Sequence, residues 1–178
     1  NTRAEARRQL VLRNNLEKRF YKKINTLFRK FLNVNLHLYR QYGIYEPDVA
    51  TQSLNEDFFP LMLSHYKRTF QAIYKLNEEK YELMRKADEA FVFGRSVDFA
   101  AAVSQYFAGR QLILAGITER MATRISVLIE KGRADDLTLP QIARMVSDKF
   151  IPISRSRSAL IARTETHSAA SFANHAYH

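Results

Sequence analysis

The sequence predicts an all-α fold, an elongated helical protein with a long basic N-terminal helix and a compact C-terminal helical module. Three observations favour this class. The 178 residues include only 5 Gly and 4 Pro, whereas a strand-rich domain needs a turn signal about every 8–12 residues. Apolar residues recur mostly at intervals of three, four or seven, which is helical spacing. Hydrophobic residues make up 46% of the chain, which is enough to bury a core.

The first predicted helix spans about residues 4 to 42 and is amphipathic. Its apolar stripe consists of Leu12, Leu16, Phe20, Ile24, Leu27, Phe31, Leu38 and Tyr42. We expect Gly43 to end this helix as a left-handed cap, and Asn33 and Asn35 are candidate interruptions within it. Because a helix of about 55–60 Å outreaches one small domain, part of the stripe should pack on another chain or on a second long helix. The residues expected to pack on a partner chain are Phe20, Ile24, Leu27 and Phe31.

Residues 43–55 lack helical periodicity and contain a proline, so we predict a connector there. Asn55 or Asp57 is expected to cap a second helix of about residues 57 to 88. Pro60 would then fall in or just beyond the first turn, where a missing N–H is best tolerated. The predicted domains are a long basic helix with its connector over residues 1–54 and a helical domain over residues 55–178.

A third helical segment is predicted over about residues 97 to 107, where alanine is frequent. It leads to a separate helix that we expect Thr118 to cap. That helix carries apolar residues at helical spacing, and Gly132 is expected to end it.

The clearest local signal in the chain is the sequence LTLPQI at 137–142. Thr138 and Gln141 have the spacing of a capping box, which predicts a short helix of about residues 139 to 149. Pro152 is expected to break this helix, because the residue before a proline avoids helical geometry. Ser154 is then a candidate cap for the final helix or helix pair.

Positive charge is concentrated in the first 42 residues of a chain whose formal net charge is +10. Such an excess favours an acidic partner, and nucleic acid is the commonest one. The candidate nucleic-acid-binding residues are Arg7, Arg8, Arg13, Lys18, Arg19, Lys22, Lys23, Arg29 and Lys30. Two alternatives remain open: a solvated helix face, which is the usual role of a charge run, and an acidic protein partner.

The sequence contains no recognisable motif for catalysis, for a metal or for a cofactor. His175 and His178 share a helical face, but the HExxH spacing of zinc helices is absent. Glu165 and His167 are two residues apart and would point away from each other on a helix. Neither GxGxxG nor GxxxxGK[ST] occurs, and there is no Cys. We therefore predict no enzyme, no metal, no cofactor and no small-molecule substrate. A membrane-spanning helix is not expected either, because no run of about 18 apolar residues exists.

Residues 154–178 combine arginines with many Ser and Ala residues. Small side chains let helix backbones approach closely, so Arg163 and Glu165 are interpreted as residues that tie helices together. Thr164 and Thr166 are candidate caps of a new helix at this point. On this interpretation, Arg163→Ala destabilises the fold more than Glu165→Gln does.

The order of GIT at 116–118, LTLPQIARMVSDKF at 137–150 and SRSRSALIARTETHSAASFANHAY at 154–177 resembles the phage Mu protein F-like family. The residues that match the family motif are Arg157, Ile161, Ala162, Arg163, Thr164, Glu165 and Thr166. The resemblance covers about residues 60 to 177 and implies that 55–178 is a Mu F-like helical domain. His167 stands where a small residue is typical of the family.

The resemblance implies a minor head, or head morphogenesis, protein of a tailed double-stranded DNA phage. The implied partners are portal protein, major capsid protein or both, with packaged double-stranded DNA as an open further partner and no membrane. The implied location is the virion, in the head interior or at the portal vertex, and the host cytoplasm during assembly. The motif residues are implied to be structural. The alternative function is a helical nucleic-acid-binding protein without a virion role.

Overall fold

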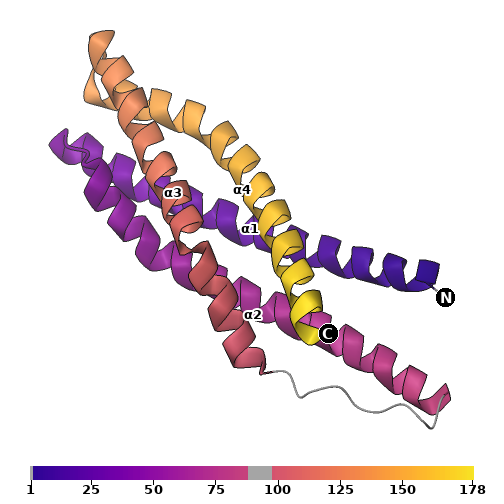
Figure 1. Ribbon diagram of the computed structural model, residues 1–178. Coiled ribbons are helices and arrows are strands. Elements are labelled where there is room, and N and C mark those ends of the chain that lie inside the picture. Colours follow the sequence, from indigo (N-terminus) through magenta and orange to yellow (C-terminus); the bar gives the residue numbers. More distant parts are fainter. Residues whose placement is uncertain (1, 88–97) are drawn as a thin grey trace. The chain divides into compact units, whose positions relative to one another are not determined.

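Four helices carry almost all of the residues that the computed structural model describes, which are residues 2–87 and 98–178 (Figure 1). The helices are α1 (Thr2–Tyr42), α2 (Pro47–Ala87), α3 (Phe99–Ala134) and α4 (Leu139–Tyr177). No strand occurs in this part of the chain. The predicted all-α class is therefore confirmed.

The prediction of one long N-terminal helix is confirmed by α1. Gly43 ends it with a φ of 66°, the left-handed region that favours glycine, and donates its N–H to the Tyr39 carbonyl at 2.8 Å. Asn35 does not interrupt the helix, because its side-chain amide donates to the Phe31 carbonyl one turn earlier, at 2.8 Å. Asn33 likewise lies inside α1.

The predicted connector over residues 43–55 is wrong, because α2 already begins at Pro47. Proline is favoured in the first helical turn and Asp48 is favourable near the positive helix N-terminus, so both residues start a helix here. Asn55 and Asp57 consequently lie inside the helix and do not cap it. Residue 88, the predicted helix end, lies outside the described residues.

Two compact units are formed by non-contiguous parts of the chain. Unit 1 comprises Asn1–Phe20, Met62–Arg110 and Ala162–His178, and unit 2 comprises Tyr21–Leu61 and Gln111–Ile161. This grouping by contact does not follow the predicted division into residues 1–54 and 55–178. Each unit draws on all four helices, so residues far apart in sequence become neighbours.

Pro60 and Pro152 both lie inside helices of unit 2, α2 and α4. The predicted break at Pro152, after a helix of about residues 139 to 149, is wrong, and so is the predicted place of Pro60 in a first turn. An interior proline costs about 3 kcal/mol through its lost hydrogen bond and its clash with the preceding turn. Burial offsets this cost, since Phe58 and Phe150, each two residues before its proline, are completely inaccessible to solvent.

The predicted caps Thr118 and Ser154 are fully buried helix-interior residues of unit 2. The Thr118 hydroxyl donates to the Asn55 side-chain oxygen, and the Ser154 hydroxyl donates to the Asn25 side-chain oxygen at 3.1 Å. Both hydroxyls therefore bond across helices, where the sequence suggested capping. The predicted helix over residues 97 to 107 is the start of α3, which continues without a break; residue 97 itself lies outside the described residues.

The start of α4 agrees closely with its local signal, whereas Gly132 does not end α3 as predicted. The Thr138 N–H donates to Gln141 Oε1 at 2.9 Å, and the Gln141 N–H donates to Thr138 Oγ1 at 3.4 Å, so the predicted capping box is confirmed. The helix runs two residues beyond Gly132, to Ala134. The absence of a Cβ at Gly132 leaves room for the side chain of Ile142, which occupies the space that a Cβ would need.

The four residues predicted to pack on a partner chain mostly lie in the core of this chain. Phe20, Ile24 and Phe31 are 2%, 0% and 7% exposed, and only Leu27 is half-buried. The prediction of a partner-chain contact is therefore corrected for the three buried residues. The other option, packing on a further long helix, is what occurs: in unit 2, Phe28 of α1 stacks on Phe58 of α2 with ring centroids 5.9 Å apart.

We expect Gly132→Ala to destabilise the protein by about 1–3 kcal/mol, because overpacking displaces its neighbours. A Cβ at this position would lie 2.7 Å from Cγ1 of Ile142. Gly109→Ala is the matched control within α3, since a Cβ there meets nothing within 4 Å. The control should gain about 0.5–1 kcal/mol from the lower backbone entropy of Ala in a helix. Urea unfolding of both variants measures the difference, and a neutral Gly132→Ala would contradict the close approach.

Candidate functional site

The candidate nucleic-acid-binding residues lie mainly on the exposed side of α1. Eight of the nine are exposed and Arg13 is half-buried. In unit 2, Lys22 and Arg29 are seven residues apart and so share a face, as do Lys23 and Lys30. The buried residues of this stretch occupy the opposite side of the helix. The same segment thus supplies a core stripe and a basic face.

A groove of about 480 Å³ lies along this basic face in unit 2. Its lining residues are Lys22, Lys23, Thr26, Leu27, Lys30, Asp57 and Leu61. Three ammonium groups face one carboxylate, so the groove has a net positive charge. Ammonium groups on long flexible side chains are suited to phosphate oxygens, which need little directional geometry.

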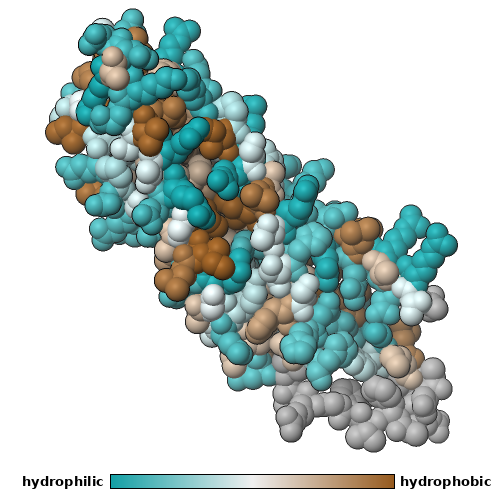
Figure 2. Space-filling model, turned by 45° about the horizontal axis from the view of Figure 1, so that its top comes forward, coloured by the Kyte–Doolittle hydropathy of each residue, from teal (hydrophilic) through white to brown (hydrophobic). Residues whose placement is uncertain are grey.

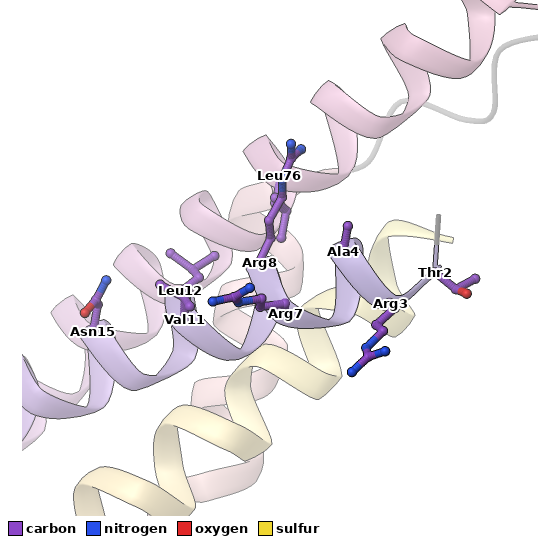
Figure 3. A pocket seen from close by; sticks show the side chains of 9 residues that line it. All are labelled: Thr2, Arg3, Ala4, Arg7, Arg8, Val11, Leu12, Asn15 and Leu76. Atoms are coloured by element: carbon purple, nitrogen blue, oxygen red, sulfur yellow. The ribbon is translucent and has the colours of Figure 1, made fainter.

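A second groove, of about 1020 Å³, lies in unit 1 and is here called the N-terminal groove (Figure 3). Its lining residues are Thr2, Arg3, Ala4, Arg7, Arg8, Val11, Leu12, Asn15 and Leu76. Figure 3 shows that α1 supplies every labelled residue except Leu76, which α2 contributes. It combines arginines with aliphatic side chains, so it is both basic and apolar.

The family-motif residue Glu165 is buried in unit 1, where it forms an ion pair with Arg110. Its side chain is 2% exposed and that of Arg110 is 20% exposed. Arg110 donates from Nε to Oε2 of Glu165 at 3.1 Å and from Nη2 to Oε1, which is a bidentate arrangement. The Tyr66 hydroxyl donates to Oε2 of the same carboxylate at 2.5 Å. Residues from α2, α3 and α4 are thereby joined.

A second buried polar contact lies beside this ion pair. Nε2 of His65 is 2.9 Å from the Thr166 hydroxyl and 3.5 Å from the Thr69 hydroxyl. The imidazole ring stacks on Phe20 of α1, with ring centroids 3.6 Å apart and planes within 8°. All four helices therefore contribute to one cluster in unit 1, because Thr166 belongs to α4 and neighbours Glu165.

Burial changes the proton affinity of the groups around Glu165. Desolvation and then the Glu165 carboxylate raise the pKa of Tyr66 well above its usual range. Desolvation, followed by Glu165, raises the pKa of Tyr106 to about 12. For Arg110, desolvation acts to lower the pKa, but the hydrogen bond and charge of Glu165 outweigh it and the pKa is raised. Both phenols therefore stay neutral and Arg110 stays charged at neutral pH.

The structure corrects the predicted roles within the motif. Arg163 is an exposed residue, with 72% of its side chain accessible, and it contacts Glu17 at 3.4 Å. Arg157 and Thr164 are exposed as well, whereas Ile161, Ala162, Glu165 and Thr166 are buried. The motif lies in the middle of α4, so Thr164 and Thr166 cap no helix. Glu165 makes the buried link between helices, whereas the link that Arg163 makes to α1 is exposed.

The contact partners of the motif residues that sequence reasoning missed are His65, Tyr66 and Arg110. They lie 55 to 101 residues from the motif residues that they contact. A tyrosine and an arginine on separate helices carry no pairing signal in a single sequence. Helical periodicity does place Tyr66 among the core residues of its helix, which is the one sign that its hydroxyl needs a buried partner.

No metal-binding cluster occurs among residues 2–87 and 98–178: no three His, Asp or Glu residues are grouped there in a way that could hold an ion. His178 accepts or donates a hydrogen bond with the Tyr81 hydroxyl at 2.7 Å, and His167 lies 3.5 Å from Glu17. None of the helices, searched over the same residues, is long and apolar enough to cross a membrane.

We expect Glu165→Gln to cost about 3 kcal/mol of unfolding free energy, because it leaves the Arg110 guanidinium without its counter-charge. Arg163→Ala should cost only about 0–1 kcal/mol, since its pair with Glu17 is exposed. Urea unfolding of the two variants at one pH gives the comparison. The reverse order, with Arg163→Ala the more damaging, would contradict the assignment of Glu165 as the central residue.

The raised pKa of Tyr106 makes part of the stability depend on alkaline pH. The pKa of Tyr106 is about 12 in the folded protein, whereas its normal value is 10.0. At a pH between these two values, the folded state keeps a proton that the unfolded state has lost. The contribution is complete below pH 10 and falls as the pH rises towards 12. Tyr106→Phe should therefore lose less stability than the parent between about pH 9 and 11, as measured by urea unfolding. An equal loss in both proteins would argue against the buried phenol.

Comparison with known proteins leaves function to be inferred from the molecule itself. No family model, no curated protein and no solved structure matches the chain. The resemblance to the phage Mu protein F-like family therefore stays a prediction from the sequence segments at 116–118, 137–150 and 154–177. What the geometry adds is a buried polar cluster around Glu165 and a basic face on α1.

Proposed function

We propose that the protein is a minor head, or head morphogenesis, protein of a tailed double-stranded DNA phage, which contacts DNA through the basic face of α1. The proposed partners are the portal protein, the major capsid protein or both, and the proposed location is the virion. The observation that carries the DNA contact is the groove in unit 2, where three lysines face a single carboxylate.

The composition of that groove supports binding to the sugar–phosphate backbone. Lys22, Lys23 and Lys30 line it, and Arg29 lies on the same exposed side of α1. Backbone contacts of this kind neutralise phosphates without reading bases, so the expected binding is independent of sequence. Arg7 and Arg8 lie in unit 1, where they line the N-terminal groove.

The use of the motif residues inside the fold supports an assembly role. Glu165 and Thr166 are occupied by Arg110, Tyr66 and His65, so their polar groups serve helix packing. A catalytic carboxylate needs access to a substrate, and Glu165 is 2% exposed. This agrees with the structural role that the family resemblance implies for the motif.

The second candidate is a helical nucleic-acid-binding protein without a virion role. The same basic groove supports it, and it requires no portal contact. Co-expression with the cognate portal protein separates the two candidates. Co-purification with portal rings in nuclease-treated extracts supports the head protein, and DNA binding without any portal association supports the alternative.

We expect the protein to bind double-stranded DNA with an affinity that falls steeply between about 50 and 300 mM salt, because phosphate contacts release counterions. Replacing Lys22, Lys23, Arg29 and Lys30 together with Gln should reduce the slope of log affinity against log salt by about 3–4. Fluorescence anisotropy with two unrelated duplexes measures affinity, slope and sequence preference.

The matched control removes the same number of charges from scattered exposed positions on other helices, namely Lys67, Arg68, Lys75 and Arg155. Both variants have the same net charge, so a difference between them reports the place of the charge. Equal weakening by the two variants, or binding that ignores salt, would count against the basic face as a DNA-binding surface.

A further inference from the structure

Three cations lie close together on the surface of α3 and α4 in unit 2. Arg124 and Lys131 are seven residues apart on α3 and therefore share a face, and Lys149 belongs to α4. All three side chains are exposed. These three residues are here called the α3–α4 cluster. They are not among the candidate nucleic-acid-binding residues predicted from the sequence, all of which belong to α1.

The packing of α3 on α4 brings the α3–α4 cluster together. Gly132 of α3 has no Cβ, and the side chains of Ile142 and Met145 of α4 occupy the space beside it, so the two helices approach closely there. Lys131 directly precedes this glycine, and Lys149 lies one turn after Met145. The register of the two helices therefore sets the two lysines side by side.

The lysines of the cluster contact each other without a shared counter-charge. Lys131 lies within hydrogen-bond reach of Lys149 and lowers its pKa, first through that contact and then through its charge, and the charge of Arg124 acts in the same direction. Ammonium groups donate hydrogen bonds and accept none, so two charged lysines cannot satisfy each other. An anion that accepted from both would remove the repulsion between them.

Few carboxylates offset this positive charge. Asp135 is the carboxylate whose charge acts on the cluster. Glu130 is paired with Arg133 at 3.2 Å, and Asp148 shares a face of α4 with Arg144, four residues before it. Within residues 2–87 and 98–178, no ion pair includes a member of the α3–α4 cluster. The cluster thus has three cations to one carboxylate, the same ratio as the groove between α1 and α2.

The α3–α4 cluster and that groove lie on opposite sides of unit 2. Each helix of the unit contacts the next in chain order, and α4 contacts α1. The contacts that show this order are Phe28–Phe58, Asn55–Thr118, Gly132–Ile142 and Ser154–Asn25. Four helices in this cyclic order place the outer surface of α1 and α2 opposite that of α3 and α4. The buried core of the unit therefore separates a ligand on one side from a ligand on the other.

The partner that fits the α3–α4 cluster is a polyanion. Exposed hydrophobic side chains occur on the protein as well, but on the face in Figure 2 they form separate groups among hydrophilic ones. A second copy of the protein is disfavoured, because each copy has a formal net charge of +10. A DNA duplex carries one phosphate charge per about 1.7 Å of its axis, so it presents several phosphates to the three cations at once.

We propose that the α3–α4 cluster is a second contact for the DNA backbone, through which one molecule bridges two DNA duplexes. The proposal rests on the proposed DNA contact of α1. One duplex then lies along the groove between α1 and α2, and the other lies on the opposite side of unit 2. Such bridging holds separate DNA segments together without any contact between copies of the protein.

A bead assay measures bridging as the retention of a fluorescent duplex on beads that carry an unrelated duplex. The parent should retain the fluorescent duplex at low salt. Replacing Arg124, Lys131 and Lys149 together with Gln should lower retention at least about 10-fold, because bridging needs both sides. The affinity for a single duplex, measured by fluorescence anisotropy, should fall less than about 5-fold, because the groove of α1 remains.

The matched control replaces Lys67, Arg68 and Lys75 with Gln, which removes the same charge from exposed positions on α2. This control should bridge like the parent. Sedimentation velocity with duplexes of about two helical turns gives the stoichiometry. The parent should carry two duplexes per molecule, and the variant of the α3–α4 cluster should carry one. Circular dichroism verifies that each variant is as helical as the parent.

The outcomes separate this proposal from the DNA contact of α1. A parent that binds no DNA would overturn both, whereas a parent that binds DNA at one duplex per molecule without bridging would overturn the second contact alone. Undiminished bridging by the variant of the α3–α4 cluster would overturn it too, since another surface or self-association then joins the duplexes. An equal loss of bridging in the control would show that net charge is responsible and not the α3–α4 cluster.

Discussion

The carboxylate of Glu165 is almost completely removed from water, and other helices of unit 1 supply its hydrogen-bond donors. Leaving such a charge without a partner costs several kcal/mol, so donors have to reach it from other helices. Arg110 of α3 and Tyr66 of α2 do so. A hydrogen bond requires the distance between donor and acceptor to be correct to within a few tenths of an ångström. The carboxylate of Glu165 therefore fixes the register of three helices more tightly than apolar packing does. Small neighbours such as Ala162 and Ala169 let the helices come close enough.

The features that sequence reasoning predicted correctly are local ones. The capping box of Thr138 and Gln141 and the terminal Gly43 each depend on residues within one turn. The buried stripe of α1 was found from Leu16 to Phe31 for the same reason, because periodicity is a property of one segment. Its predicted continuation is wrong, since Leu38 and Tyr42 are exposed and Leu36 and Tyr39 are buried instead. The basic face follows directly from the buried stripe, as the side of the helix that the stripe does not occupy.

The features that were missed depend on residues far away in sequence. Thr118 and Ser154 have the residue types of caps, and only the positions of Asn55 and Asn25 reveal that they bond across helices. Pro60 and Pro152 suggested breaks because the loss of a hydrogen bond is visible in sequence while the compensating burial is not. The sequence analysis predicted that Arg163 matters more for stability than Glu165, but Glu165 is the buried residue of the two. Nothing in one sequence marks Arg110 as the counter-charge of Glu165.

The composition of unit 1 has a consequence for the order of events during synthesis. Its last segment, residues 162–178, leaves the ribosome after every other part of the unit has been made. Until then Arg110, Tyr66 and His65 cannot reach their partners on α4. The contacts of His65 and Tyr66 close chain loops of about 100 residues. Unit 2 is complete once residue 161 has been synthesised, so it can assemble first. Unit 1 is therefore the unit that stays incomplete for longer during synthesis. During this time its aromatic residues are exposed to chaperones and proteases.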